Sequence, residues 1–264
     1  MDCYEGTPAE AAGIEAGDVL VSADGLQAVD VELDVLAAAI KGSEENAVHL
    51  VLMRAGETYE KDVEKARIEV HMVESRMLED QIGYIRISQF TAHVAEDFTK
   101  AYESMLADGM KGLVVDLRSN PGGLMDSVVD TLNVFMPEGL LVYTEDRAGA
   151  RTEYSSEGES PIEIPLAVLV NGNSASASEI FAGAVKDYGV GTLVGTVTFG
   201  KGIVQKTYSM ADGSAVKMTT AYYYTPKGEC IHGKGIQPDV EVEPEQDSGE
   251  DVQLQKAVEI CRKK

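Results

Sequence analysis

The sequence predicts an α/β protein in which buried parallel strands alternate with helices, preceded by a smaller module of different pattern. Two short, continuous apolar runs, "GLVVDL" (112–117) and "LAVLV" (166–170), have the length and composition of strands buried on both faces. Each run leads through small residues into a helix pattern. Parallel strands joined by right-handed crossovers are the natural solution for such an alternation.

The smaller module is predicted for residues 1–73. Thr7-Pro8 predicts the start of a short helix, because proline is favoured at the first helical position. The run "DVLVSADG" (18–25) alternates as a strand and ends in a turn. A helix pattern over residues 31–42 and two or three strands over residues 47–70 complete the module.

The α/β core is predicted for residues 74–264. "IGYIRISQF" (82–90) alternates as a strand, and apolar residues follow at helical spacing up to the stop at Gly109. The remaining expected elements are helices over 121–136, 176–189 and 253–264, strands over 191–195 and 215–224, and an acidic loop over 245–252.

Composition excludes several classes of function. The chain has 45 Asp and Glu against 22 Lys and Arg, a formal charge of −23, and no cluster of basic residues. A nucleic-acid partner is therefore not expected, and we attribute the acidity to solubility. No apolar run approaches the roughly 18 residues of a membrane helix. The three cysteines and four histidines lack metal-ligand spacing, so no metal or other cofactor is expected.

Two strand-to-helix turns carry the small residues that acyl transfer needs. "DLRSNPGGLMDS" (116–127) passes two glycines at a helix start, and "VNGNSASASEIFAG" (170–183) places Ser174, Ser176 and Ser178 at alternate positions. Backbone N–H groups at a helix start lack intrahelical acceptors and can bind a developing oxyanion. Hydrolases often place their nucleophile at such a turn. The spacing does not choose among the three serines.

The sequence offers two candidates for the general base that would activate such a serine. Lys201 lies between two glycines, and no carboxylate lies within five residues on either side to hold it protonated. A lysine acts as a general base only in its neutral form. His232, in the turn-rich stretch "GECIHGKG", stays open as an alternative base.

Several motifs in one order carry a family resemblance. They are "GYIRISQF", "DLRSNPGG", "NGNSASASEIFAGAVKD", "GTVTFGKGIVQ" and "TPKGECIHGKGIQPDVEV". Together they resemble the carboxyl-terminal processing proteases, serine endopeptidases related to the tail-specific protease. The stretch "GTPAEAAGIEAGDVLVSADG" (6–25) resembles a PDZ domain of the bacterial type. The resemblance implies a crotonase-like (ClpP/crotonase) protease core over residues 74–264 and a PDZ domain over residues 1–73.

The resemblance also implies site residues. Ser176 would be the nucleophile, Lys201 its base, and Gln205 the polar residue that orients the lysine. The implied oxyanion donors are the backbone N–H groups of Ala177 and of Gly122 or its neighbour Gly123.

Partners and location also follow from the resemblance. It implies protein or peptide substrates with apolar C-terminal tails, bound by adding a strand to the PDZ sheet. The peptide-binding strand and carboxylate loop would lie before or around residues 1–5, so the PDZ domain is expected to be N-terminally incomplete. An extracytoplasmic location is implied, in the cell envelope or secreted, with membrane association through an N-terminal region absent from this chain. No particular oligomeric state is implied.

Two other interpretations stay open. The first is a catalytically silent PDZ scaffold on a protease-like core, against which the complete Ser/Lys/Gln set argues. The second is an acyl-CoA enzyme of the crotonase type. Such an enzyme shares the core and the oxyanion N–H groups but needs neither a Ser-Lys pair nor a PDZ domain.

Overall fold

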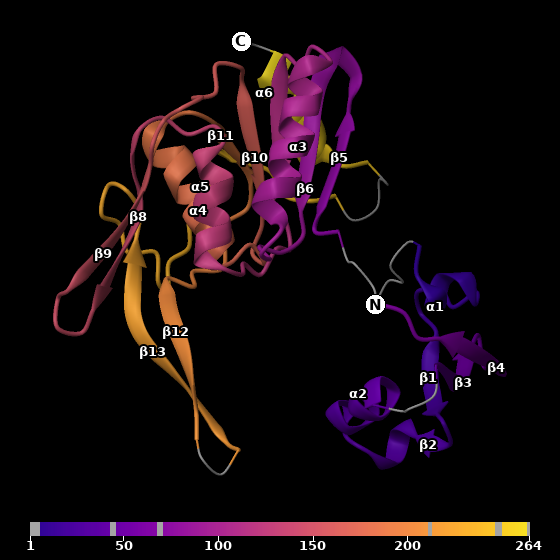
Figure 1. The fold of residues 1–264 in the computed structure, drawn as a ribbon. Helices are drawn as coiled ribbons and strands as arrows, with labels where there is room; N and C mark the ends of the chain where they lie inside the picture. Colours follow the sequence, from indigo (N-terminus) through magenta and orange to yellow (C-terminus); the bar gives the residue numbers. More distant parts are fainter. Residues whose placement is uncertain (1–5, 43–45, 68–70, 211–212, 246–249, 263–264) are drawn as a thin grey trace. The chain divides into compact units, whose positions relative to one another are not determined.

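The computed structural model describes residues 6–42, 46–67, 71–210, 213–245 and 250–262 (Figure 1). The chain divides into two compact units, Met1–His71 and Met72–Lys264. The predicted peptide-binding strand and carboxylate loop around residues 1–5 lie outside the described residues. In the described part of the chain, no helix combines the length and the apolar character that crossing a bilayer requires.

The first unit is built on an antiparallel sheet with strand order β2-β1-β3-β4. Thr7 starts α1, because its side chain accepts a hydrogen bond from the Glu10 N–H at 3.4 Å. The predicted helices and strands of this unit are confirmed, whereas the short β2 and η1 were not predicted. The elements are α1 (Pro8–Ala11), β1 (Val19–Ala23), β2 (Leu26–Gln27), η1 (Ala28–Asp30), α2 (Leu33–Gly42), β3 (Ala47–Arg54) and β4 (Glu57–Glu64).

The main sheet of the second unit has the strand order β14-β11-β10-β7-β6-β5. All neighbours are parallel except the pair of β5 with β6, so the predicted parallel core is confirmed. Its strands β7 and β10 are completely buried. The strands are β5 (Val73–Met77), β6 (Ile82–Ile87), β7 (Gly112–Asp116), β10 (Leu166–Val170), β11 (Thr192–Gly195) and β14 (Val240–Glu241), and η2 (Glu79–Gln81) precedes β6.

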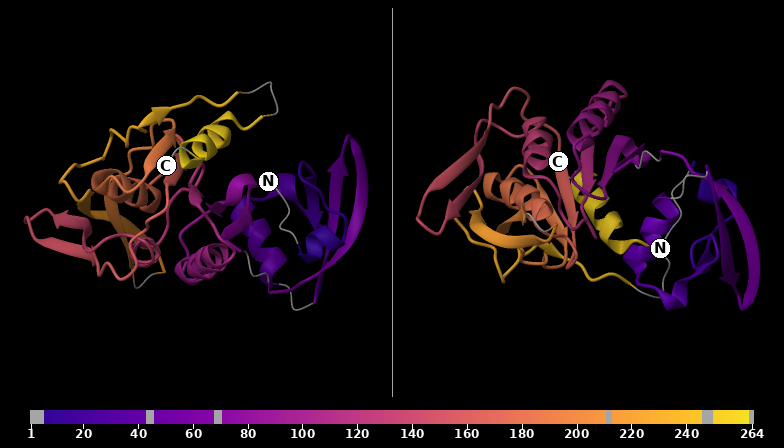
Figure 2. Two further views of the ribbon diagram at one scale, coloured as in Figure 1. Left: turned by 90° about the horizontal axis from the view of Figure 1, so that it is seen from above. Right: turned by 60° about the horizontal axis from the view of Figure 1, so that its bottom comes forward.

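Helices cover both faces of this sheet (Figures 1 and 2). On one face, α3 (Val94–Ala107), α4 (Met125–Asn133) and α5 (Ala177–Tyr188) enclose a large apolar cluster that includes Phe98, Phe135 and Phe181. On the other face, Ala257 and Cys261 of α6 (Val252–Arg262) pack against a smaller cluster. The predicted helices are confirmed, although α4 begins four residues later than expected.

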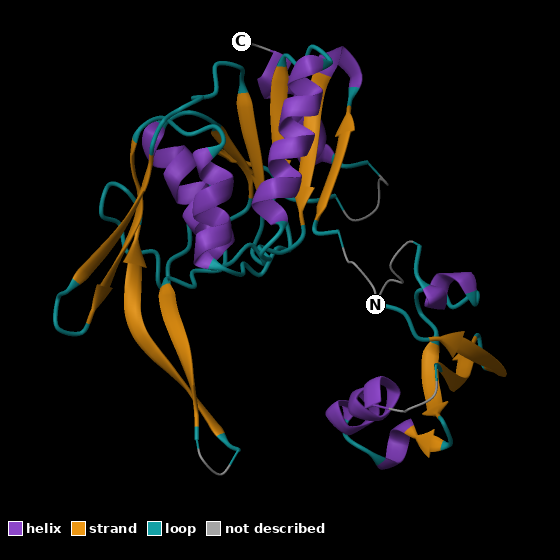
Figure 3. Cartoon of the chain, viewed as in Figure 1, coloured by secondary structure: helices purple, strands orange, loops and turns teal. Residues whose placement is uncertain are grey.

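A second, antiparallel sheet lies beside this core, with strand order β12-β13-β8-β9. The β12–β13 hairpin projects away from the helices and the main sheet (Figure 3). Of its strands, only β13 was predicted; β9 and β12 mix polar with apolar residues, and β8 was missed although its residues 140–143 are apolar. The strands are β8 (Gly139–Asp146), β9 (Arg151–Ser156), β12 (Ile203–Ser209) and β13 (Ala215–Tyr224).

Candidate active site

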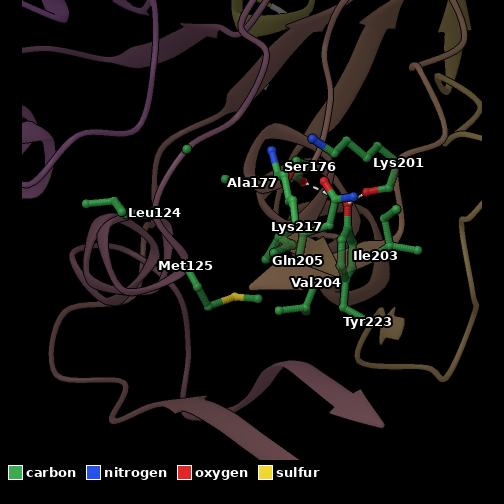
Figure 4. A pocket seen from close by; sticks show the side chains of 12 residues that line it. Leu124, Met125, Ser176, Ala177, Lys201, Ile203, Val204, Gln205, Lys217 and Tyr223 are labelled. Carbon is green, nitrogen blue, oxygen red and sulfur yellow. Dashed lines mark hydrogen bonds between the residues drawn. The ribbon is translucent and has the colours of Figure 1, made fainter. Parts of the chain in front are cut away.

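A pocket of about 290 Å³ in the second unit brings most of the predicted site residues together (Figure 4). Ser176, Ala177, Lys201, Gln205 and Gly123 all line it, although they come from segments far apart in the sequence. Gly122 does not line it. The other lining residues are Leu124, Met125, Ile180, Ile203, Val204, Lys217 and Tyr223.

Strand pairing explains why two of these segments meet. The strands β7 and β10 are parallel neighbours, so the turns that follow them emerge at the same edge of the sheet. Asn120, fully buried in the first turn, fastens the second turn to it. Its carbonyl accepts hydrogen bonds from the Ala175 N–H and the Ser178 hydroxyl, both at 3.0 Å. Its side-chain amide donates to the Ile87 carbonyl at 2.8 Å, which holds Asn120 against β6.

The structure separates the three serines that the sequence spacing left equivalent. Ser174 is fully buried, donates to the Leu117 carbonyl at 2.8 Å and accepts from the Asn171 N–H. Ser178 is fully buried and also donates to a backbone carbonyl. Ser176 is half-buried, lines the pocket, and has the positive φ of 56° that non-glycine residues rarely adopt. Such strain is concentrated at functional sites.

Glu179 is a completely buried carboxylate that was not predicted to be a site residue. One of its oxygens accepts from the backbone N–H groups of Ser176 (2.9 Å) and Lys201 (2.8 Å). The other accepts from the Thr198 hydroxyl (2.6 Å) and the Gly200 N–H (2.7 Å). Glu179 therefore ties the serine turn to the lysine loop. The spacing S-x-x-E at a helix start, typical of a capping box, is the sequence signal that identifies it.

Tyr223 makes a second connection between the same two segments. Its hydroxyl lies in hydrogen-bonding reach of the carbonyl oxygens of Ser176 (3.0 Å) and Lys201. Burial raises the pKa of Tyr223 far above its ordinary value, so the hydroxyl stays protonated and acts as a donor. Only β-strand periodicity marked this residue in the sequence, because nothing local shows what its hydroxyl will meet.

Backbone N–H groups suited to an oxyanion are present in both turns. Ala177 is the first residue of α5, so its N–H has no intrahelical acceptor. The Gly122 N–H donates to Asn120 Oδ1 at 2.8 Å. The Gly123 N–H donates no hydrogen bond within the described residues, and Gly123 lines the pocket. Of the two expected glycines, Gly123 is therefore the one with an available donor.

Both glycines are required by close approach of other backbone. A Cβ on Gly123 would overlap the Phe90 carbonyl, and φ there is +151°. A Cβ on Gly122 would lie 2.6 Å from the Ala175 carbonyl oxygen, with φ of +99°. The absence of a side chain at Gly122 lets the two turns pack this closely, and its absence at Gly123 lets the first turn pack against Phe90.

The candidate bases occupy different surroundings. Lys201 is half-buried and enters the pocket, but across the described residues its ammonium forms no hydrogen bond with the Ser176 hydroxyl. Such contacts often form only when substrate binds. Gln205, on β12 opposite Thr219, is exposed and lines the same pocket. His232 packs beside Tyr222, with ring centroids 5.5 Å apart, and is not among the lining residues.

Comparison with known proteins identifies the class. The model of peptidase family S41 matches residues 81–242, and a PDZ domain model matches residues 2–54. The chain belongs to peptidase family S41, a family of serine-type peptidases, and carries a PDZ domain.

Individual relatives make the resemblance more specific. The carboxyl-terminal-processing protease of a Synechocystis species is 37% identical over 97% of this chain and 62% of its own length. That of a Picosynechococcus species is 36% identical over 97% of this chain and 64% of its own length. Among solved structures, a photosystem II D1 C-terminal processing protease is 34% identical, with a TM-score of 0.63 over 92% of this chain and 68% of that chain. The predicted resemblance is thus confirmed, and the chain spans less than two thirds of these two curated relatives.

Proposed function

We propose that this chain contains the peptidase and PDZ parts of a serine endopeptidase that cleaves proteins near their C-terminus through a Ser176–Lys201 dyad. One observation carries the proposal. Ser176, held in a strained conformation at the start of α5, shares a pocket with Lys201, and among the described residues no Asp or Glu lines that pocket. A carboxylate partner that would keep the lysine charged is therefore not part of the pocket wall.

The proposed reaction has two halves. Neutral Lys201 takes the proton of the Ser176 hydroxyl as the oxygen attacks the scissile carbonyl, and the N–H groups of Gly123 and Ala177 bind the resulting oxyanion. The lysine then gives its proton to the departing amine as the peptide C–N bond breaks. In the second half, Lys201 takes a proton from water, the hydroxide attacks the acyl-enzyme, and the proton returns to Ser176. Gln205 orients the lysine amine by a hydrogen bond.

The substrate assignment rests on the PDZ domain and the family. PDZ domains bind extended C-terminal segments along a sheet edge, which would deliver a protein tail to the peptidase. We propose protein or peptide substrates with apolar tails, an extracytoplasmic location, and a core of crotonase-like type. The carboxyl-terminal-processing names of the relatives support this substrate class.

The geometry disfavours the two alternatives that the sequence left open. An acyl-CoA enzyme needs the oxyanion N–H groups but no lysine base beside a serine. A silent scaffold has no use for a strained serine, or for a buried carboxylate that ties it to the lysine loop. The strained conformation of Ser176 costs free energy of folding, for which a catalytic role would account.

The test is cleavage of a long unstructured polypeptide with an apolar C-terminus, followed by mass spectrometry. We expect cleavage by the wild type and a loss of at least about 10³-fold in Ser176→Ala and Lys201→Ala. Lys206→Ala is the matched control, because Lys206 is exposed and does not line the pocket. Equal cleavage by all four proteins would exclude the dyad, and thioester turnover without peptide cleavage would favour the acyl-CoA enzyme.

A further inference from the structure

A second lysine, Lys217 of β13, lines the same pocket as Ser176 and Lys201 (Figure 4). Its side chain is exposed, and across the described ranges it forms no ion pair or side-chain hydrogen bond. The chain has about twice as many acidic as basic residues, 45 against 22, so a pocket wall with lysines and no described carboxylate differs from the average composition of the chain. The pocket wall contains two ammonium groups and no described carboxylate.

The hairpin register fixes the direction of this lysine. Lys217 pairs with Thr207 and Thr219 pairs with Gln205 across β12 and β13. Alternate residues of a strand share a face, so Lys217 lies on the same face as Thr219 and its partner Gln205. Lys206, one residue after Gln205, points to the opposite face and is not part of the pocket wall.

We propose that the Lys217 ammonium binds a carboxylate of the peptide substrate close to the scissile bond. The inference rests on the proposed peptidase function and names a feature of its substrates. The carboxylate belongs either to an acidic side chain or to a chain terminus lying just beyond the cut. The apolar wall formed by Met125, Ile180 and Val204 receives the neighbouring apolar side chain.

Electrostatics explains why such a residue would be needed. A strongly acidic protein repels acidic peptides at long range. A lysine in the pocket makes the local electrostatic potential positive, so it attracts a peptide carboxylate there. Lys217 suits this task better than Lys201 does. The main chain at Lys201 is held by Glu179 and Tyr223, whereas Lys217 lies on an exposed strand where its ammonium can meet an incoming chain.

The experiment compares kcat/KM for matched peptides. One arm uses amidated peptides with Glu or Gln at each of the two positions on either side of the cut. The other arm uses a free or an amidated C-terminus placed shortly after the cut. In wild type, we expect the carboxylate member of one arm to be preferred by about threefold to fivefold at low salt, and the preference to shrink as salt is added. The arm that responds identifies the source of the carboxylate.

Charge reversal makes the test specific. Lys217→Glu is expected to abolish or invert the preference, and Lys206→Glu to retain it. Lys206→Glu introduces the same charge on the same hairpin but on the face away from the pocket. An unchanged Glu/Gln ratio in Lys217→Glu, or equal shifts in both variants, would overturn the inference.

A binding measurement separates this inference from the peptidase assignment. Fluorescence anisotropy of the same peptides with Ser176→Ala and with Ser176→Ala/Lys217→Glu reports carboxylate recognition without turnover. A preference that depends on Lys217, in a protein whose wild type cleaves no peptide, would support the carboxylate site and reject the peptidase. Cleavage by wild type, together with the same peptide affinities in both variants, would support the peptidase and reject the carboxylate site.

Discussion

The main chains of Ser176 and Lys201 share two hydrogen-bonding partners. Glu179 accepts from both of their N–H groups, at 2.9 and 2.8 Å, and the Tyr223 hydroxyl reaches both of their carbonyl oxygens. Glu179 through the N–H groups and Tyr223 through the carbonyl oxygens thus hold the main chains of Ser176 and Lys201 in a fixed position relative to each other. This backbone frame is present although the side chains of Ser176 and Lys201 do not hydrogen-bond to each other within the described residues.

Replacing the buried carboxylate tests one half of this frame. In Glu179→Gln one acceptor oxygen becomes an NH₂ group that faces two donors, so part of the network is broken. We expect kcat to fall by about 10²-fold, as for a small misplacement of reacting groups. The free energy of unfolding should fall by about 1–3 kcal/mol. Steady-state kinetics and thermal unfolding measure both, with Glu103→Gln on the exposed face of α3 as the control.

Removing the tyrosine hydroxyl tests the other half. Tyr223→Phe keeps the ring in the core and leaves two carbonyl oxygens without their donor. We expect kcat to fall about tenfold with KM little changed, because the loss displaces the dyad without removing the pocket wall. The neighbouring exposed Tyr222→Phe should retain activity. A rise in KM at constant kcat would instead assign Tyr223 to substrate binding.

The packing of the first turn against Phe90, just after β6, depends on glycine. In Gly123→Ala, the new Cβ overlaps the Phe90 carbonyl at a φ of +151°, so we expect the free energy of unfolding to fall by about 3 kcal/mol or more, with loss of activity. Gly149 also has a positive φ, +84°, but a Cβ there meets open space. Gly149→Ala should lose only about 1 kcal/mol and remain active. Chemical denaturation of both proteins makes the comparison.

The first unit should respond to acid through Asp18. Its side chain is 2% exposed and forms hydrogen bonds with Arg54 at 2.6 and 2.7 Å, and the Arg54 hydrogen bonds hold the pKa of Asp18 far below its ordinary value. A carboxyl whose pKa is lowered on folding stabilises the fold above its unfolded pKa of about 3.9, and this contribution is lost as the pH falls further.

The stability difference between wild type and Asp18→Asn should therefore be full at neutral pH and narrow below about pH 4. Hydrogen exchange of the amides in residues 6–42 and 46–67 measures this stability difference in the first unit alone. Glu57→Gln, at an exposed position on β4, is the control. A difference between wild type and Asp18→Asn that stays constant down to pH 2 would contradict the assigned role of the Asp18–Arg54 pair.

The predictable part of the fold is the part that is buried on both faces. Residues 112–117 and 166–170 are continuous apolar runs, and they form β7 and β10 as expected. The strand β8 was missed although its residues 140–143 form a short apolar run, whereas β9 and β12 escaped prediction because they are largely exposed and mix polar with apolar residues. Edge strands of this kind are specified by their partners more than by their own sequence.

The site residues also divide into those that a local sequence motif identifies and those whose role depends on contacts between distant parts of the chain. Family resemblance supplied Ser176, Lys201 and Gln205, whose motifs are local. Choosing between Gly122 and Gly123 required the hydrogen bond from Gly122 to Asn120, which only the folded turn shows. The local S-x-x-E pattern marks Glu179 only as a capping residue. Its link to the lysine loop and the role of Tyr223 depend on contacts across 19 to 47 residues of sequence, which no local pattern encodes.

Activation of Ser176 by Lys201 is measured by covalent labelling with a fluorophosphonate, which reacts with activated serines, followed by peptide mapping. We expect an adduct on Ser176 in the wild type, none on Ser174 or Ser178, and labelling at least about 10²-fold slower in Lys201→Ala. Labelling of another serine, or an equal rate in Lys201→Ala, would contradict the Ser176–Lys201 dyad.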